Sequence, residues 1–169
     1  MGTTAGDAAQ KDRFFAWYGM LKANARVLDE IERELDTESG LPLSWFEVLV
    51  NLSHCGTGDA CRMRMNELAD LLVVSRGGVT RIVARLEEAG LVKRVIPKED
   101  RRATFAVLTP AGQTKLDAAG PLVERSVQRH FGRHLSGRDV AGLRRAIVKI
   151  LEGEGFQAQP ASMDAEAAA

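Results

Sequence analysis

The chain has 169 residues, of which 45% are apolar and 27% are charged. This length and composition are typical of a globular protein with one domain, or with a small domain and an assembly region. No run of about 18 apolar residues is present, so no membrane span is indicated. The N-terminus lacks the regions of a secretion signal, and two cysteines, Cys55 and Cys61, do not make a disulfide framework. We therefore expect a cytoplasmic protein with no membrane partner.

The net charge is zero, but the charge is unevenly distributed along the chain. Residues 62–102 hold ten Lys or Arg side chains against six Asp or Glu, whereas the other residues hold 13 basic and 17 acidic side chains. A protein that docks one face on nucleic-acid phosphates and keeps its other faces neutral or acidic has this distribution. The alternative is a charged surface that is merely solvated, so charge alone does not decide between the two.

The first expected element is a long helix. Residues 1–10 are small and polar, and we expect them to be disordered. From residue 11 to about residue 38 the apolar side chains recur at helical spacing. Gly40 and Pro42 end that pattern because neither residue continues a helix well.

Three shorter helices are expected next. A capping box at Ser44 and Glu47 would open the first of them. Asn66 is expected to cap the second, and Ser75 the third, which would stop at Gly90. The last two helices are short and closely spaced, and this arrangement is typical of a helix-turn-helix.

A β-hairpin follows the third short helix. Residues 91–96 and 103–108 have the composition of paired strands, and the polar, charged segment 97–102 is typical of the turn between them. Thr109, followed by Pro110 at the first helical position, would then start another helix.

Two helices are expected in the last third of the chain. The first would run from residue 110 to about residue 131, with a bend at Gly120-Pro121. Ser136 and Asp139 form a capping pair that would open the second, which would end at residue 153. The segment 153–169 has low complexity, and we expect it to be disordered.

The order of elements predicts a mainly α (α+β) fold, in which a winged helix-turn-helix with a two-stranded β wing is flanked by N- and C-terminal helices. We assign residues 43–109 to the DNA-binding winged module, and residues 11–42 and 110–152 to a helical dimerisation region. The flanking helices carry apolar stripes that a second copy would cover, unless the helices fold back on their own chain. The expected dimer contacts are Phe14, Leu21, Leu28, Leu143, Ile147 and Leu151.

The helix expected after Ser75 has polar and basic residues opposite its apolar side. A recognition helix places its N-terminal residues at base edges in the major groove, and its first-turn N–H groups can hold a phosphate. Gly77 and Gly78 would let the backbone approach DNA closely, or would simply fray the helix start. The candidate contacts are Ser75, Arg76, Gly77, Gly78, Thr80, Arg81 and Arg85.

The hairpin is the second candidate DNA contact. A thin ribbon with arginine at its tip can enter the minor groove, where the negative potential is concentrated. Asp100 can orient a neighbouring guanidinium by a charge-assisted pair, or form an exposed salt bridge of little value. The candidate wing contacts are Arg94, Lys98, Asp100, Arg101 and Arg102.

Five linked motifs, ELA, VTR, RLEEAGL, DRR and LTPAG, occupy residues 67–69, 79–81, 85–91, 100–102 and 108–112. Together they resemble the MarR (multiple antibiotic resistance regulator) family of winged-helix transcription factors. The resemblance implies a sequence-specific transcriptional repressor that binds a pseudo-palindromic operator as a homodimer. The first, fifth and sixth helices of each chain would form the dimer interface. It also implies that the recognition helix reads the major groove of double-stranded DNA, that a wing arginine enters the minor groove, and that a small aromatic or phenolic effector releases the DNA.

The resemblance places an effector pocket between the dimer region and the winged module. The residues that map to it are Trp17, Leu21, Trp45, Phe46, Val50 and Arg81. Tryptophans beside a cation would suit an aromatic acid, although such side chains also serve as ordinary core.

Other modes of regulation stay open. Cys55 and Cys61 could sense an oxidant or, with His54, bind a metal, although the family's peroxide sensors carry their cysteine at the first helix. His130 and His134 could bind a metal from one helix face. A DNA-binding architectural protein without an effector is also possible. No motif for catalysis or for a resident cofactor is present, so we expect neither an enzyme nor a cofactor.

Overall fold

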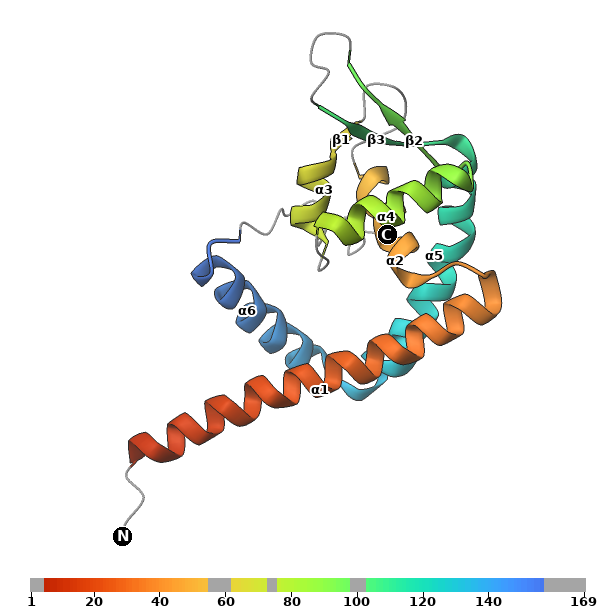
Figure 1. The fold of residues 1–169 in the computed structure, drawn as a ribbon. Coiled ribbons are helices and arrows are strands. Elements are labelled where there is room, and N and C mark those ends of the chain that lie inside the picture. Colours follow the sequence, from red (N-terminus) through yellow and green to blue (C-terminus); the bar gives the residue numbers. More distant parts are fainter. Residues whose placement is uncertain (1–4, 55–61, 73–75, 98–102, 157–169) are drawn as a thin grey trace.

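The computed structural model describes residues 5–54, 62–72, 76–97 and 103–156. The fold is mainly helical, with one small sheet near its upper end (Figure 1). In chain order the elements are α1 (Ala5–Ser39), α2 (Leu43–Ser53), β1 (Met63–Arg64), α3 (Met65–Leu71), α4 (Arg76–Glu88), β2 (Val92–Val95), β3 (Phe105–Leu108), α5 (Pro110–His130), the 3-10 turn η1 (Gly132–His134) and α6 (Gly137–Gly153).

The hydrophobic core lies in the winged module, where α2, α3 and α4 pack with the sheet and the first half of α5. On α4, Val79, Val83 and Leu86 recur at helical spacing, and each is at most 1% exposed. Leu49 of α2 and Leu68 of α3 meet them in the same cluster. Full burial of such a side chain stabilises the fold by about 1.5–3 kcal/mol, so this core holds α4 firmly in place.

The junction between α4 and α5 is closed by short-range contacts. Gly90 ends α4 with φ of +72°, and the N–H of Leu91 donates to the carbonyl of Leu86 at 2.9 Å. Thr109 caps α5: its Oγ1 accepts from the N–H of Gly112 at 3.0 Å and donates to the carbonyl of Gly90 at 2.7 Å. The stop at Gly90 and the cap at Thr109 are therefore confirmed.

Gly112 has a steric role at the same junction. A Cβ atom added there would lie 2.1 Å from the carbonyl oxygen of Leu91 and 2.7 Å from Cδ1 of Leu108. Only glycine lets the first turn of α5 approach the backbone this closely. The glycine of the LTPAG motif thus seats α5 against the strand that follows α4.

The sheet has three antiparallel strands in the order β1-β3-β2, rather than the two that we expected. β2 and β3 form the expected hairpin, and β1 pairs with the other edge of β3, with Arg64 opposite Phe105. The N–H of Met65 also donates to the carbonyl of Thr104 at 3.1 Å. Two residues are too few to show strand periodicity, so the sequence did not indicate β1.

Two expected helix starts differ from the structure. α2 begins at Leu43 after Pro42, without a side-chain cap, so the expected capping box of Ser44 and Glu47 is wrong. α3 begins one residue before Asn66, and it is the carboxylate of Glu67 that accepts from the backbone N–H of Arg64, at 2.9 Å. Both helices keep their expected places.

α1 is longer than expected, and its two halves differ. It begins at Ala5, so residues 5–10 are helical and not disordered. The C-terminal half packs on α5, where Glu34 Oε1 lies 2.7 Å from Arg129 Nη1 and 2.9 Å from His130 Nε2. The N-terminal half projects away from the rest of the chain (Figure 1).

α6 stands apart from the winged module (Figure 1). Its start is confirmed, because the Ser136 hydroxyl accepts from the N–H of Asp139 at 3.3 Å and the Asp139 carboxylate accepts from the N–H of Ser136 at 2.9 Å. Its apolar side chains lie on one face, yet the helix has no buried residue. The tail from residue 157 onward, where we expected disorder, lies outside the described residues.

Candidate nucleic-acid interface

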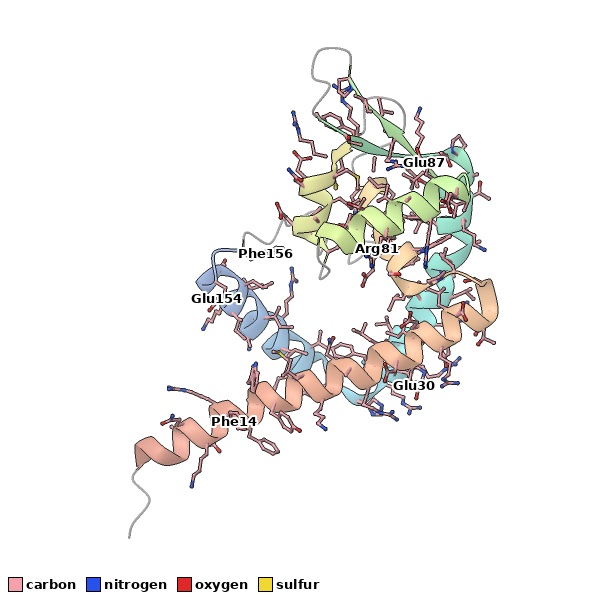
Figure 2. The ribbon with its side chains drawn as sticks, in the orientation of Figure 1. Phe14, Glu30, Arg81, Glu87, Glu154 and Phe156 are labelled. Carbon is pink, nitrogen blue, oxygen red and sulfur yellow. The ribbon has the colours of Figure 1, made fainter. Side chains whose placement is uncertain are left out.

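α4 presents the face opposite its buried valines and leucine to the outside. Gly77, Thr80, Arg81 and Arg85 are all exposed, and the wing base adjoins one side of the helix (Figure 2). Gly78 is half-buried. No atom of the described residues lies within 4 Å of a Cβ placed on Gly77, so packing within the described part of the chain does not require a glycine there. This leaves close approach by a partner as a physical reason for it.

Several of the expected DNA contacts cannot be compared with the structure. Ser75 and the expected wing tip, formed by Lys98, Asp100, Arg101 and Arg102, lie outside the described residues. Arg76 is the first residue of α4, and its backbone alone is described. The roles predicted for these side chains therefore stay predictions.

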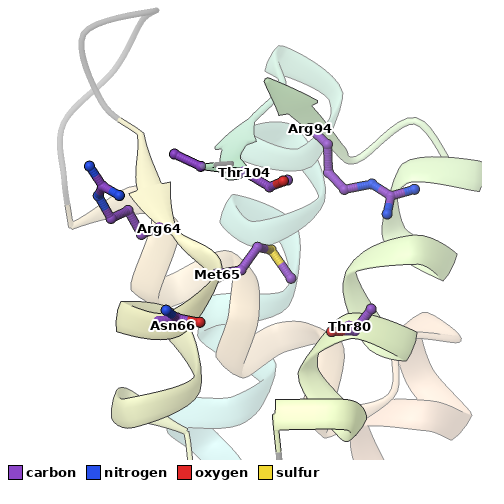
Figure 3. Close-up of a pocket in the computed structure, with 7 residues that line it drawn as sticks. Arg64, Met65, Asn66, Thr80, Arg94 and Thr104 are labelled. Carbon is purple, nitrogen blue, oxygen red and sulfur yellow. The ribbon is translucent and has the colours of Figure 1, made fainter. Parts of the chain in front are cut away.

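A hollow of about 280 Å³ lies between the start of α3, the outer side of α4 and the base of the wing (Figure 3). We call it the wing-base notch, and its lining residues are Arg64, Met65, Asn66, Thr80, Arg94, Ala103 and Thr104. Arg64 and Arg94 stand on opposite sides of it, with Asn66 and Thr80 below (Figure 3). Polar side chains thus line a concave surface directly beside α4.

One wall of the notch is held by an ion pair. Arg94 Nε lies 2.6 Å from the carboxylate of Glu87, and the N–H of Arg94 donates to the same carboxylate at 3.1 Å. These two hydrogen bonds lower the pKa of the Glu87 carboxyl, which keeps the pair charged. Arg94, expected as a wing contact with DNA, therefore also ties β2 to α4.

The other wall is held by an aromatic ring. The guanidinium carbon atoms of Arg62 and Arg64 lie 4.8 and 5.0 Å from the ring centroid of Phe105, a cation–π arrangement. Both arginines are exposed, whereas Phe105 is buried. Sequence reasoning missed these two arginines because the contact depends on the pairing of β1 with β3.

The residues expected to line an effector pocket differ in burial, and their shared role stays a prediction. Trp45, Phe46 and Val50 pack against the core cluster that contains Leu35 of α1. Trp17 is 51% exposed and precedes Leu35 by 18 residues, which is about 27 Å along a helix. Trp17 therefore lies far along α1 from the point where that helix meets the core.

The alternative sensor residues are placed only in part. Cys55 and Cys61 lie outside the described residues, and His54 is exposed after α2. α5 ends at His130 while His134 lies in the following 3-10 turn, so the helix face that we expected them to share does not exist. Within the described ranges, no group of three or more metal-binding side chains occurs.

The residues expected at a dimer interface are accessible in the single chain. Phe14 is 63% exposed and contacts the rings of Trp17 and Tyr18 on the projecting half of α1 (Figure 2). Leu21 and Leu28 are also exposed. Half-buried Leu143, Ile147 and Leu151 lie along α6.

Among the described helices, none is long and apolar enough to cross a membrane.

Comparison with known proteins finds relatives of this chain among transcriptional regulators. Residues 39–103, from the end of α1 to the base of the wing, match the model of the MarR family. The transcriptional regulator PrsX from Escherichia coli is 35% identical over 96 residues, which are 54% of this chain and 53% of that protein. This chain thus matches about half the length of that curated relative.

Solved structures match over almost the whole chain. AbsC from Streptomyces coelicolor, a MarR family transcriptional regulator, shares 32% identity and a TM-score of 0.73, over 93% of this chain and 99% of AbsC. Sco3205 from the same organism, solved in complex with DNA, shares 26% identity and a TM-score of 0.75, over 94% of this chain and 96% of Sco3205. The resemblance found in the motifs is confirmed, and this chain belongs to the MarR family of transcriptional regulators.

Proposed function

We propose that the protein is a transcriptional regulator that binds a specific, pseudo-palindromic DNA operator as a homodimer. The observation that carries the proposal is the exposed side of α4, where Arg81 and Arg85 lie opposite a fully buried apolar side. A helix fixed in this way can enter the major groove without disturbing its own core. The structure of Sco3205 in complex with DNA supports DNA binding by this chain.

The apolar faces of α1 and α6 support the dimer. In one chain the α1 face is exposed and the α6 face is half-buried. A second copy would bury both faces further, because a two-fold interface brings the same surface together twice. In a dimer, the two α4 helices would read half-sites about 10 bp apart or a multiple of that distance. This is the geometry of an inverted-repeat operator.

Repression and its release form the finer part of the proposal. A dimer that covers an operator would exclude other proteins from it, and a small aromatic effector would release the DNA. Trp17 supports a pocket completed by the partner chain, because it is exposed and about 27 Å along α1 from the core contact at Leu35. A ligand that binds only the folded protein would raise its melting temperature.

Selection of bound DNA from a random pool tests the main proposal. We expect an inverted repeat to be enriched, and Arg102→Ala to weaken binding to the selected site strongly while the melting temperature stays unchanged. A Lys11→Ala variant on the projecting end of α1 serves as the control for loss of one positive charge. If the full-length protein enriches no sequence, the proposed function is wrong.

A further inference from the structure

Arg64 and Arg94 line opposite walls of the wing-base notch, and their guanidinium groups point away from one another to its two outer sides (Figure 3). Each guanidinium group is held in place by a different contact. Arg94 is held by the carboxylate of Glu87 on α4. Arg64 is held by the face of Phe105 on β3. An arginine whose side chain is already ordered loses less conformational entropy when it binds an anion.

The groups between these walls are also suited to an anion. Asn66 and Thr80 line the notch from α3 and α4, and Thr104 lines it from the segment before β3. Their amide and hydroxyl groups can donate hydrogen bonds. The Arg94–Glu87 pair uses Nε and one terminal nitrogen of the guanidinium, and the opposite edge of that group carries further N–H donors.

The negative charge near the notch is already engaged. Glu87 accepts from the side chain and the backbone N–H of Arg94, and Glu67 accepts from the backbone N–H of Arg64. Arg62 adds a third guanidinium on the same ring as Arg64. Among the described residues, three guanidinium groups and two carboxylates therefore lie at this site.

We propose that the wing-base notch seats one strand of the DNA backbone, with Arg64 and Arg94 contacting phosphates. The notch lies between α4, which would enter the major groove, and the wing, which would enter the adjacent minor groove. The backbone strand that separates these two grooves must pass between the two elements. Phe105 is a positioning residue, because it orients Arg64 and Arg62 without reaching the DNA. This inference rests on the proposed function, since it assumes that the protein binds double-stranded DNA.

The salt dependence of binding tests the assignment of Arg64. Each phosphate contact contributes about 0.9 to the slope of log affinity against log salt. We expect Arg64→Ala to lower that slope by about one and to weaken binding to the operator and to unrelated DNA by the same factor, roughly tenfold. Arg64→Lys keeps the charge and should retain the slope.

Two further variants separate contact from scaffolding. Arg125→Ala removes one exposed cation from α5, where it pairs with Glu38 at 3.4 Å, and it should change neither the slope nor the affinity. Phe105→Leu keeps every charge but removes the ring. We expect it to weaken binding with little change in slope, because the phosphate contact is still made but by a less ordered side chain. Circular dichroism and melting temperature would confirm that each variant is folded.

The outcomes are distinct. If wild-type protein binds no DNA, the proposed function itself is wrong. If wild type binds and Arg64→Ala keeps the wild-type slope, the notch is not a backbone site, whatever happens to the affinity. A loss confined to the operator would also overturn the inference, because phosphate contacts carry no sequence information.

Discussion

The winged module and the terminal helices differ in how much of their apolar surface one chain can bury. Leu49, Leu68 and Leu86 of the module are completely buried, on three different helices. α6 buries no residue, and the projecting half of α1 exposes Phe14, which is followed on the same helix by further exposed aromatic side chains. Both regions have amphipathic helices, but only the module buries its apolar side chains within one chain; the apolar side chains that the terminal helices leave accessible are those that the proposed dimer would cover.

The largest effect is expected where the module is tightest. Leu86→Ala should lower the free energy of unfolding by about 2–5 kcal/mol, because it leaves a cavity in a fully packed site. Ile150→Ala on α6 is the matched control; its side chain is 53% exposed, and its effect in dilute monomer should stay within about 0.5 kcal/mol. Denaturant titration measures both. Equal losses would contradict the distinction between the two regions.

The junction between the two regions provides the next test. Gly112→Ala should destabilise the protein by about 1–3 kcal/mol, because the new methyl group overlaps the carbonyl of Leu91. Gly120→Ala is the same change on the same helix, but nothing lies within 4 Å of its Cβ. There we expect a gain of about 0.4–1 kcal/mol from the lower entropy of the unfolded chain. Thermal unfolding of the pair measures both, and a tolerated Gly112→Ala would show that α5 is not seated this tightly.

A variant in the terminal helices should change how the melting temperature depends on protein concentration, whereas a variant in the module core should not. If α6 is buried in a dimer, Ile147→Ser lowers the melting temperature and removes its dependence on concentration. Arg145→Ser lies on the opposite face of the same helix and introduces the same side chain, so it should leave that dependence in place. Sedimentation across a range of concentrations gives the oligomeric state. A wild-type protein that stays monomeric at every concentration would contradict the role assigned to α6.

The parts of the fold that the sequence predicted depend on local contacts. Gly90 ends α4, Thr109 caps α5, and Ser136 with Asp139 caps α6; each signal acts between residues a few positions apart. β1 escaped prediction because its only signal is pairing with a strand some forty residues later in the chain. The early start of α1 escaped prediction because its first turns carry no apolar face to mark them.

The same distinction holds for the candidate interface. Arg81 and Arg85 could be assigned from helical spacing alone, because a buried stripe on one side of α4 leaves them outward. The roles of Arg64 and Glu87 could not, because the first depends on the ring of Phe105 and the second on the course of β2. The exposure of Trp17 could not be predicted for a similar reason, since a helical pattern does not say which end of α1 meets the core.

The smallest expected effect on stability is at the contact between α1 and α5, where two terminal helices pack against each other within one chain. Ser126, His130 and Arg129 lower the pKa of Glu34 from 4.5 to about 2. Ser126 has the largest effect on this pKa, but among the described residues its Oγ has no hydrogen-bond partner. The informative variants are therefore at His130 and Arg129, whose side-chain nitrogen atoms lie 2.9 and 2.7 Å from Glu34 Oε1. A carboxyl whose pKa is lower in the folded state contributes stability above its unfolded pKa, and that contribution is lost as the pH falls toward the folded value.

We therefore expect wild type to be more stable than Glu34→Gln at pH 7, by a margin that shrinks as the pH falls from about 5 to about 2. The margin should be smaller throughout in the Arg129→Ala, His130→Gln background, where the partners of the carboxylate are gone. Denaturant unfolding at a series of pH values measures the difference between each pair. A margin that is independent of pH would mean that the Glu34 carboxylate adds no charge-dependent stability to the contact between α1 and α5, which would then rest on packing and on the exposed Arg125–Glu38 pair.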